Sequence, residues 1–306
     1  MGPIPSLERL VEAARAAGPR RLVVAAAESD TALAAAGEAR RRGLAEVVLV
    51  GAPRALRERL ERLGEDPSQF TLEPAGDDLE AARRAVALVR AGEGAVILKG
   101  RIATADLLRA VLHRTEGLRT DRLLSDVLVA DHPLAQAPRL VGVTDGGVNV
   151  APGLEQKQQI IENAAAVFRA LGVARPRVGC LCAAEVGSDA MPHTRDAEAL
   201  ARAAAAGELG ACEVSGPLAL DNLVSAEAAR AKGIADPVAG QADVILAPSI
   251  EAGNALGKAF TYLARRPVAH VIAGARAPVL IPSRVESAAD KLCSIALGVL
   301  VAGSAP

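Results

Sequence analysis

The feature that most constrains the fold is an alternation of short, β-rich apolar runs with longer helical stretches rich in Ala, Leu and Arg. Between the runs, apolar positions recur at helical spacing, as in residues 79–89 and 197–206. Strands that alternate with helices in this way favour βαβ units, so we expect an α/β fold with mostly parallel sheets. The expected strands are Leu22–Ala26, Val47–Val50, Ala95–Leu98, Leu140–Val143, Arg177–Cys182, Val244–Ala247 and Val279–Ile281.

The length of 306 residues points to two domains, because single hydrophobic cores usually stop growing near ~250 residues. The core must be aliphatic, since the aromatic residues are only three Phe and one Tyr. Few aromatic rings and a net charge of -1 leave neither stacking platforms nor a basic footprint for a polyanion. We therefore do not expect nucleic acid as a partner.

The cysteines and the apolar segments indicate a cytoplasmic protein without a membrane partner. Cys180, Cys182, Cys212 and Cys293 show no C-x-x-C spacing and no neighbouring His, so they are expected to be small buried side chains and no metal site is predicted. The N-terminus carries acids, unlike a signal peptide. No apolar run reaches the ~18 uninterrupted residues that a transmembrane helix needs.

Polar residues gather directly after several of the expected strands, where open α/β sheets bind their ligands. Lys99 and Gly100 follow one strand, residues 144–147 follow another, residues 248–254 a third, and Ser283 with Arg284 the last. Glycine, amide, hydroxyl and cationic groups at these positions predict a ligand that carries phosphate.

The C-terminal segment offers both a chemical and a plain structural interpretation. A strand that delivers Ser283 and Arg284 to the start of a helix would make an anion site, because the helix N-terminus presents free N–H groups and the positive end of its dipole. A helix starting near Ser283 would place Asp290 about two turns inside it. However, Ser283-x-x-Glu286 and Ser287-x-x-Asp290 both match the capping-box pattern, and spacing alone favours that interpretation.

Two loops also allow alternatives. The stretch TDGGVNVAP at residues 144–152 could hold a ligand through Asp145 and Asn149, or could be an ordinary loop with Asx turns. At residues 216–222, Gly-Pro is typical of a turn, and Asp221 could simply cap the next helix.

Several familiar enzyme signatures are absent from the sequence. The histidines are scattered, with no pair at i, i+4, so structural roles are favoured for His113, His132, His193 and His270. There is no G-x-S-x-G, G-x-x-x-x-G-K-[ST] or G-x-G-x-x-G pattern, which removes the usual hydrolase, kinase and dehydrogenase signals.

Taken together and in order, the motifs resemble the phosphate acetyl/butyryltransferase family over essentially the whole chain. The likeness is somewhat closer to the butyryltransferase branch. The matching pieces are LKG at 98–100 with Thr104, TDGGVNVAP at 144–152, QKQQIIENA at 156–164, MPHTRDA at 191–197, GPLALDNLVSAEAARAKGI at 216–234, ADVILAPSIEAGN at 242–254, Lys258, Ser283-Arg284 and Asp290.

The resemblance implies a fold of two α/β lobes with an active cleft between them, similar to isocitrate-dehydrogenase-like folds, and a homodimer or higher homo-oligomer. It places residues 1–139 and 275–306 in the first lobe, and 140–274 in the second. It also implies that Ser283 and Arg284 contact the phosphate and thioester, and that Asp290 is the general base. The substrate-binding candidates are Lys99, Gly100, Thr144, Asp145, Gly146, Asn149, Asp221, Asn222, Glu251, Asn254 and Lys258.

The sequence departs from the family pattern in two places. The acetyltransferase branch uses further arginines in its first lobe, and in this sequence Arg101, Arg119 and Arg122 are only neighbours of that region. Relatives often carry an acid or amide at the position of Ser249 and a tyrosine at the position of Gly257. The resemblance therefore does not define the shape of this wall of the site.

The activity that the resemblance implies is the reversible conversion of a short acyl-CoA and phosphate to an acyl phosphate and CoA, with butyryl-CoA favoured and acetyl-CoA as the alternative. Coenzyme A is then a substrate, and no permanently bound cofactor is expected. A nicotinamide-dependent dehydrogenase of similar fold is a remote alternative, because no D-x-x-x-D set of metal-binding acids is found. A catalytically silent binding subunit is disfavoured by the joint presence of Ser283, Arg284 and Asp290.

Overall fold

The structure, a computed structural model, describes residues 2–283 and 286–304 and divides into two compact units. Unit 1 comprises Met1–Leu7 and Leu123–Val268, and unit 2 comprises Glu8–Arg122 and Ala269–Pro306. The expected boundaries at 139/140 and 274/275 differ from this division. The first would separate β5 (Ser125–Asp131) from its antiparallel partner β6 (Leu140–Thr144), so sheet pairing assigns both strands to unit 1.

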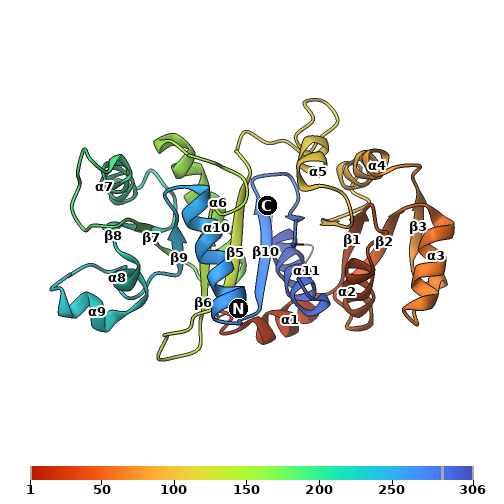
Figure 1. Cartoon of the computed structure of the whole chain (residues 1–306), viewed down its shortest axis with the longest axis horizontal. Coiled ribbons are helices and arrows are strands. Elements are labelled where there is room, and N and C mark those ends of the chain that lie inside the picture. The colour runs from red at the N-terminus through yellow and green to blue at the C-terminus, as the bar shows by residue number, and fades with distance from the viewer. Residues whose placement is uncertain (1, 284–285, 305–306) are drawn as a thin grey trace. The chain divides into compact units, whose positions relative to one another are not determined.

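Unit 2 is built on strands in the order β3-β2-β1-β4-β11-β10 (Figure 1). Neighbours from β3 through β11 are parallel, and β10 is antiparallel to β11. The mostly parallel α/β class expected from the sequence is confirmed. The strands of this unit are β1 (Arg20–Ala25), β2 (Ala45–Gly51), β3 (Thr71–Pro74), β4 (Val96–Lys99), β10 (Val268–Ala273) and β11 (Val279–Leu280).

Helices pack on both sides of these strands. Figure 1 shows α4 and α5 on one side and α2 and α11 on the other, and each pair is in contact. The N-terminus of α4 is capped by the Asp77 carboxylate, which accepts a hydrogen bond from the Glu80 N–H at 2.7 Å. The helices are α1 (Leu7–Ala16), α2 (Asp30–Arg41), α3 (Pro53–Arg62), the 3₁₀ turn η1 (Pro67–Gln69), α4 (Asp78–Arg90), α5 (Thr104–Val111) and α11 (Ala288–Gly303).

Unit 1 has the strand order β5-β6-β9-β7-β8, parallel throughout except for the β5–β6 pair. Its elements besides β5 and β6 are α6 (Leu154–Ala170), β7 (Arg177–Leu181), α7 (Pro192–Ala205), β8 (Glu213–Leu218), α8 (Leu220–Val224), α9 (Ala226–Ala231), β9 (Val244–Leu246), α10 (Ile250–Lys258) and the π-helical turn η2 (Ala259–Leu263).

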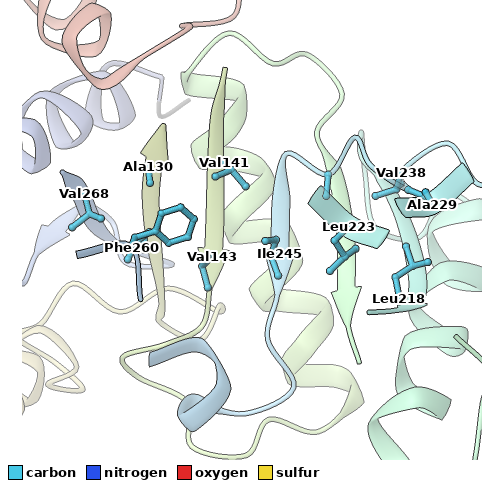
Figure 2. Close-up of a cluster of buried hydrophobic side chains, with 13 residues drawn as sticks. Ala130, Val141, Val143, Leu218, Leu223, Ala229, Val238, Ile245, Phe260 and Val268 are labelled. Atoms are coloured by element: carbon cyan, nitrogen blue, oxygen red, sulfur yellow. The ribbon is translucent and has the colours of Figure 1, made fainter. Parts of the chain in front are cut away.

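The core of unit 1 is aliphatic, as composition requires. Figure 2 shows a buried cluster to which β6 contributes Val141 and Val143, β9 contributes Ile245, and Phe260 adds an aromatic ring. Burying such side chains contributes about 1.5–3 kcal/mol each, so the cluster fixes the strands that carry the loops described below.

Two local expectations are wrong. Gly216-Pro217 lies inside β8 and not in a turn, and the pairing of β7 with β8 shifts register beside it. Helix α11 begins at Ala288 with Ser287 as its N-cap, and not near Ser283. Asp290 therefore lies in the first turn of this helix, because Ser287 and Asp290 form the reciprocal cap that the sequence allowed.

Candidate active site

Unit 2 contains a pocket of about 260 Å³ at the carboxyl ends of neighbouring parallel strands. It lies where β1, β4 and β11 end, because β4 pairs in parallel with both of the others. The described residues that line it are Glu28, Ser29, Thr31, Lys99, Gly100, Arg101, Pro282, Ser283 and Lys291.

The close approach of β4 to β1 requires a glycine at one position of this pocket. The Gly100 N–H donates to the Ala25 carbonyl at 2.9 Å, and a Cβ added to Gly100 would lie 2.0 Å from the Ala26 carbonyl oxygen. Because that oxygen belongs to the backbone, no side-chain rotation relieves the clash. Gly100 is therefore a packing requirement of the strand tip, whatever else it contacts.

The pocket is cationic. Among its described lining residues, Lys99, Arg101 and Lys291 are basic and Glu28 is acidic. The Glu28 Oε1 atom accepts from the Ala52 N–H at 2.7 Å, and its Oε2 atom lies 4.0 Å from Arg101 Nε, which also pairs with Asp78 at 2.8 Å. The positive charge of the pocket therefore comes mainly from the two lysines. A pocket with this balance of charge suits an oxyanion.

The two lysines of the pocket are buried, and the ammonium group of each donates hydrogen bonds to nearby backbone carbonyls. Lys99 Nζ donates to the carbonyls of Gly100 and Ile102, both at 3.4 Å. Lys291 Nζ donates to the Ser283 carbonyl at 3.1 Å, and burial lowers the pKa of this ammonium from its usual value. The pocket thus places positive charge beside the Ser283 turn at the tip of β11.

Asp290 adjoins this pocket through its neighbour Lys291. The Asp290 Oδ2 atom accepts from the Ser287 hydroxyl at 2.7 Å and from the Ser287 N–H at 3.2 Å, which is the capping box. Because Oδ2 accepts both hydrogen bonds of the cap, Asp290 could act as a base only through Oδ1. Arg284, the remaining expected catalytic residue, lies outside the described residues.

Unit 1 brings a second group of candidates together at the end of β6. The Asp145 carboxylate accepts from the Gly147, Val148 and Asn149 N–H groups at 2.7, 2.9 and 3.1 Å, and from Asn149 Nδ2. Burial raises the pKa of Asp145, although these hydrogen bonds oppose the rise. Its carboxylate thus organises its own loop, which is the ordinary Asx-type role that the sequence left open.

The same loop is fastened to neighbouring elements. The Thr144 hydroxyl donates to the Asp126 carbonyl at 2.7 Å, and Asn254 Nδ2 on α10 donates to the Gly146 carbonyl at 3.0 Å. Glu251 lies in the first turn of α10, where a hydrogen bond from Ser249 lowers its pKa. Lys258 ends this helix, with Nζ 5.8 Å from the centroid of the Tyr262 ring.

Asp221 and Asn222 form a third group after β8. Asn222 is fully buried and its Nδ2 donates to Glu185 Oε1 at 2.5 Å, while Lys232 Nζ contacts both Glu185 (2.9 Å) and Asp221 (3.1 Å). This network of hydrogen bonds and ion pairs holds the loop between β7 and α7 against α8.

Sequence reasoning missed several pocket residues. Glu28, Ser29 and Thr31 follow the carboxyl end of β1, and that position is the signal that could have identified them. Lys291 adjoins Asp290 but carries no motif of its own. Only the neighbourhood of β1, β4 and β11 brings these side chains into one pocket.

No described helix has the length and apolar character needed to cross a membrane. Within residues 2–283 and 286–304, there is likewise no cluster of three or more His, Cys, Asp or Glu side chains arranged to hold a metal ion.

Comparison with known proteins places the chain in one family. A family model described as phosphate acetyl/butaryl transferase matches residues 71–299. The phosphate butyryltransferase of Clostridium acetobutylicum is 36% identical over 301 residues, covering 98% of this chain and 99% of that protein. The phosphate acetyltransferase of Thermotoga maritima is 39% identical over 299 residues, covering 97% and 99%. A crystal structure of a branched-chain phosphotransacylase from Enterococcus faecalis V583 matches with a TM-score of 0.81 at 27% identity, covering 92% of this chain and 99% of that one. The chain belongs to the phosphate acetyl/butaryl transferase family.

Proposed function

We propose that this protein transfers a short acyl group reversibly between the thiol of coenzyme A and inorganic phosphate. The observation that carries the proposal is the cationic pocket of unit 2, in which Lys99, Lys291 and Ser283 meet at the ends of parallel strands. Such a pocket suits the phosphate group that both directions of the reaction use.

In the direction of acyl-CoA synthesis, the CoA sulfur attacks the carbonyl carbon of the acyl phosphate while the thiol proton passes to Asp290. The bond from the carbonyl carbon to the phosphate oxygen then breaks, and phosphate leaves as an anion stabilised by Lys99 of the pocket. Ser283 donates a hydrogen bond to the carbonyl oxygen as it gains negative charge. Arg284 contributes a further cation to the phosphate in this proposal.

Transfer of the thiol proton to a carboxylate is unfavourable by itself. Moving a proton from a free thiol to a free carboxylate is uphill by about 6 kcal/mol, from ordinary pKa values of ~8.5 and ~3.9. The positive charge of the pocket must therefore stabilise the developing thiolate as well as the phosphate.

The remaining substrate-binding candidates are proposed to hold CoA and the acyl chain. These are the loop residues Thr144, Asp145, Gly146 and Asn149, the α10 residues Glu251, Asn254 and Lys258, and the pair Asp221 and Asn222. Butyryl-CoA is the favoured substrate on the motif likeness, and acetyl-CoA is the alternative. The relatives carry both names, and one or two methylene groups change binding by only ~1–3 kcal/mol.

The wider setting is also part of the proposal. We propose a cytoplasmic enzyme, which fits the buried free thiols of Cys180, Cys182 and Cys212. We further propose a homodimer or higher homo-oligomer, supported by the family likeness and testable by sedimentation equilibrium. The dehydrogenase alternative is not favoured, because the matching family model and the relatives named above are acyltransferases.

The direct test is release of free CoA thiol from acyl-CoA in the presence of phosphate. Acetyl-, propionyl-, butyryl- and a branched acyl-CoA are compared at equal concentration, each with a control without phosphate. We expect phosphate-dependent release, fastest with butyryl-CoA. Absence of release from all four substrates would contradict the acyltransferase proposal, and fastest release from acetyl-CoA would favour the alternative.

A further inference from the structure

The turn between β11 and α11 is held from both sides of Ser283. The Ser283 N–H donates to Glu286 Oε1 at 2.9 Å, and Lys291 Nζ donates to the Ser283 carbonyl at 3.1 Å. Lys291 Nζ also donates to the Glu286 carbonyl at 2.6 Å. Both backbone polar groups of Ser283 are therefore bound by side chains of the following turn and helix.

The two side chains that hold Ser283 are buried and oppositely charged. Only 3% of Lys291 is exposed, and the Glu286 side chain is 6% exposed. The Glu286 Oε1 atom also lies 3.7 Å from His270 Nε2 on β10. Packing alone does not call for such residues, because apolar side chains of similar volume often fill a buried site at equal or better stability. Their hydrogen bonds to the turn point to another role.

The donors of Lys291 are largely committed to the backbone. An ammonium group has three N–H donors, and two of them serve the carbonyls of Ser283 and Glu286. Lys291 and Ser283 also line the same pocket. The position of Ser283 at the pocket wall is thus set by a charge-assisted contact and not by the strand alone, since β11 ends at Leu280.

We propose that Lys291 and Glu286 are positioning residues that clamp Ser283 at the wall of the pocket. The proposal rests on the acyl-transfer function above, in which the Ser283 hydroxyl stabilises the carbonyl oxygen during reaction. An oxyanion donor acts only at hydrogen-bond distance, and a displacement of 1 Å can cost ~100-fold in rate. The clamp therefore acts on turnover more than on the affinity for phosphate.

The test compares kcat with the dissociation constant for phosphate. Lys291→Met keeps the length of the side chain but removes its donors, and we expect kcat to fall about 10- to 100-fold while phosphate affinity changes less than about 3-fold. Lys291→Arg restores donors and should recover part of the loss. The matched control is Lys157→Met, which removes another buried ammonium, one that pairs with Asp196 in unit 1 at 2.6 Å; it should keep kcat.

A second pair of variants tests the other half of the clamp. Glu286→Gln keeps an oxygen that can accept from the Ser283 N–H and should retain kcat within about 3-fold, whereas Glu286→Ala should lower it like Lys291→Met. If circular dichroism shows that Lys291→Met does not fold, the two Glu286 variants still test whether the clamp positions Ser283.

Three outcomes would overturn the clamp. Loss of phosphate affinity in Lys291→Met with kcat intact would make Lys291 a direct anion ligand. Unchanged kcat in both Lys291→Met and Glu286→Ala would remove the positioning role. Equal losses in Glu286→Gln and Glu286→Ala would show that charge, and not the N–H acceptor, matters. If the wild-type protein itself releases no CoA, the acyl-transfer function fails first and the clamp falls with it.

Discussion

At the scale of single residues, Asp290 has two predicted roles, of which the structure shows the capping role. Its spacing from Ser287 predicted a capping box, and the structure forms it through Oδ2. The family likeness predicted a general base, and the cap leaves that role to the second oxygen. An N-cap contact contributes ~1 kcal/mol, while a general base contributes ~10²–10⁴ in rate, so the two roles can be separated by experiment.

We expect Asp290→Asn to lower kcat about 100-fold or more while the affinity for CoA stays within about 3-fold. The amide oxygen of Asn can still accept from Ser287, so the melting temperature should change little. Steady-state kinetics measures kcat, a direct binding assay measures the affinity for CoA, and a thermal melt measures the melting temperature. A variant that keeps most of its turnover would leave Asp290 with the capping role alone.

At the scale of elements, the sequence predicted β1, β2, β4, β6, β7, β9 and β11, and it missed β3, β5, β8 and β10. Strand β1 is buried along its last four positions and was placed to within two residues. Strand β3 is an edge strand containing Thr71, Glu73 and Pro74, and β8 contains Gly216-Pro217. Their membership in the sheet comes from pairing with a neighbour, which no local pattern records.

The β5–β6 connection carries a pH-sensitive group. His132 follows β5, accepts from the Leu134 N–H through Nδ1 at 3.2 Å, and is 8% exposed. Burial, with a smaller contribution from the charge of Arg139, lowers the pKa of His132 to about 4. The folded protein thus keeps this imidazole neutral at pH values where the unfolded chain, with an ordinary His pKa of ~6.5, already binds a proton.

We therefore expect the free energy of unfolding to fall as pH drops from about 6.5 towards 4, with His132 accounting for about 1–3 kcal/mol. Urea unfolding followed by the fluorescence of Tyr262, the single tyrosine and a residue of unit 1, measures this at several pH values. His132→Gln should flatten the dependence, and His193→Gln in the same unit should not. An equal slope in wild type and His132→Gln would contradict the assignment.

At the scale of the whole molecule, each unit organises its own part of the candidate chemistry. Unit 2 holds the cationic pocket, the Ser283 turn and Asp290, while unit 1 holds the loop of Asp145 and the network around Asn222. The first group is suited to phosphate. A ligand that binds only the folded state stabilises it by mass action, which makes the pocket testable without any turnover.

Phosphate should raise the melting temperature of the protein, because at a free concentration of 100 times its dissociation constant it would add about 2.7 kcal/mol to stability. Differential scanning calorimetry in phosphate, with chloride at matched ionic strength as the control, measures the shift. Lys99→Met removes a cation of the pocket and should abolish most of it. A shift of the same size in this variant would place phosphate elsewhere.

The sequence by itself determined the α/β class, the parallel strands with continuous apolar runs, and the family, because periodicity and the order of motifs are properties of the chain read locally. Tertiary structure alone decided that the ends of β1, β4 and β11 share one pocket, that β5 belongs to unit 1, and that Lys291 and Glu286 hold Ser283. The physical reason is that crossover connections and the burial of apolar side chains determine which strands become neighbours in the sheet. Residues far apart in the chain therefore meet only once the sheet has formed.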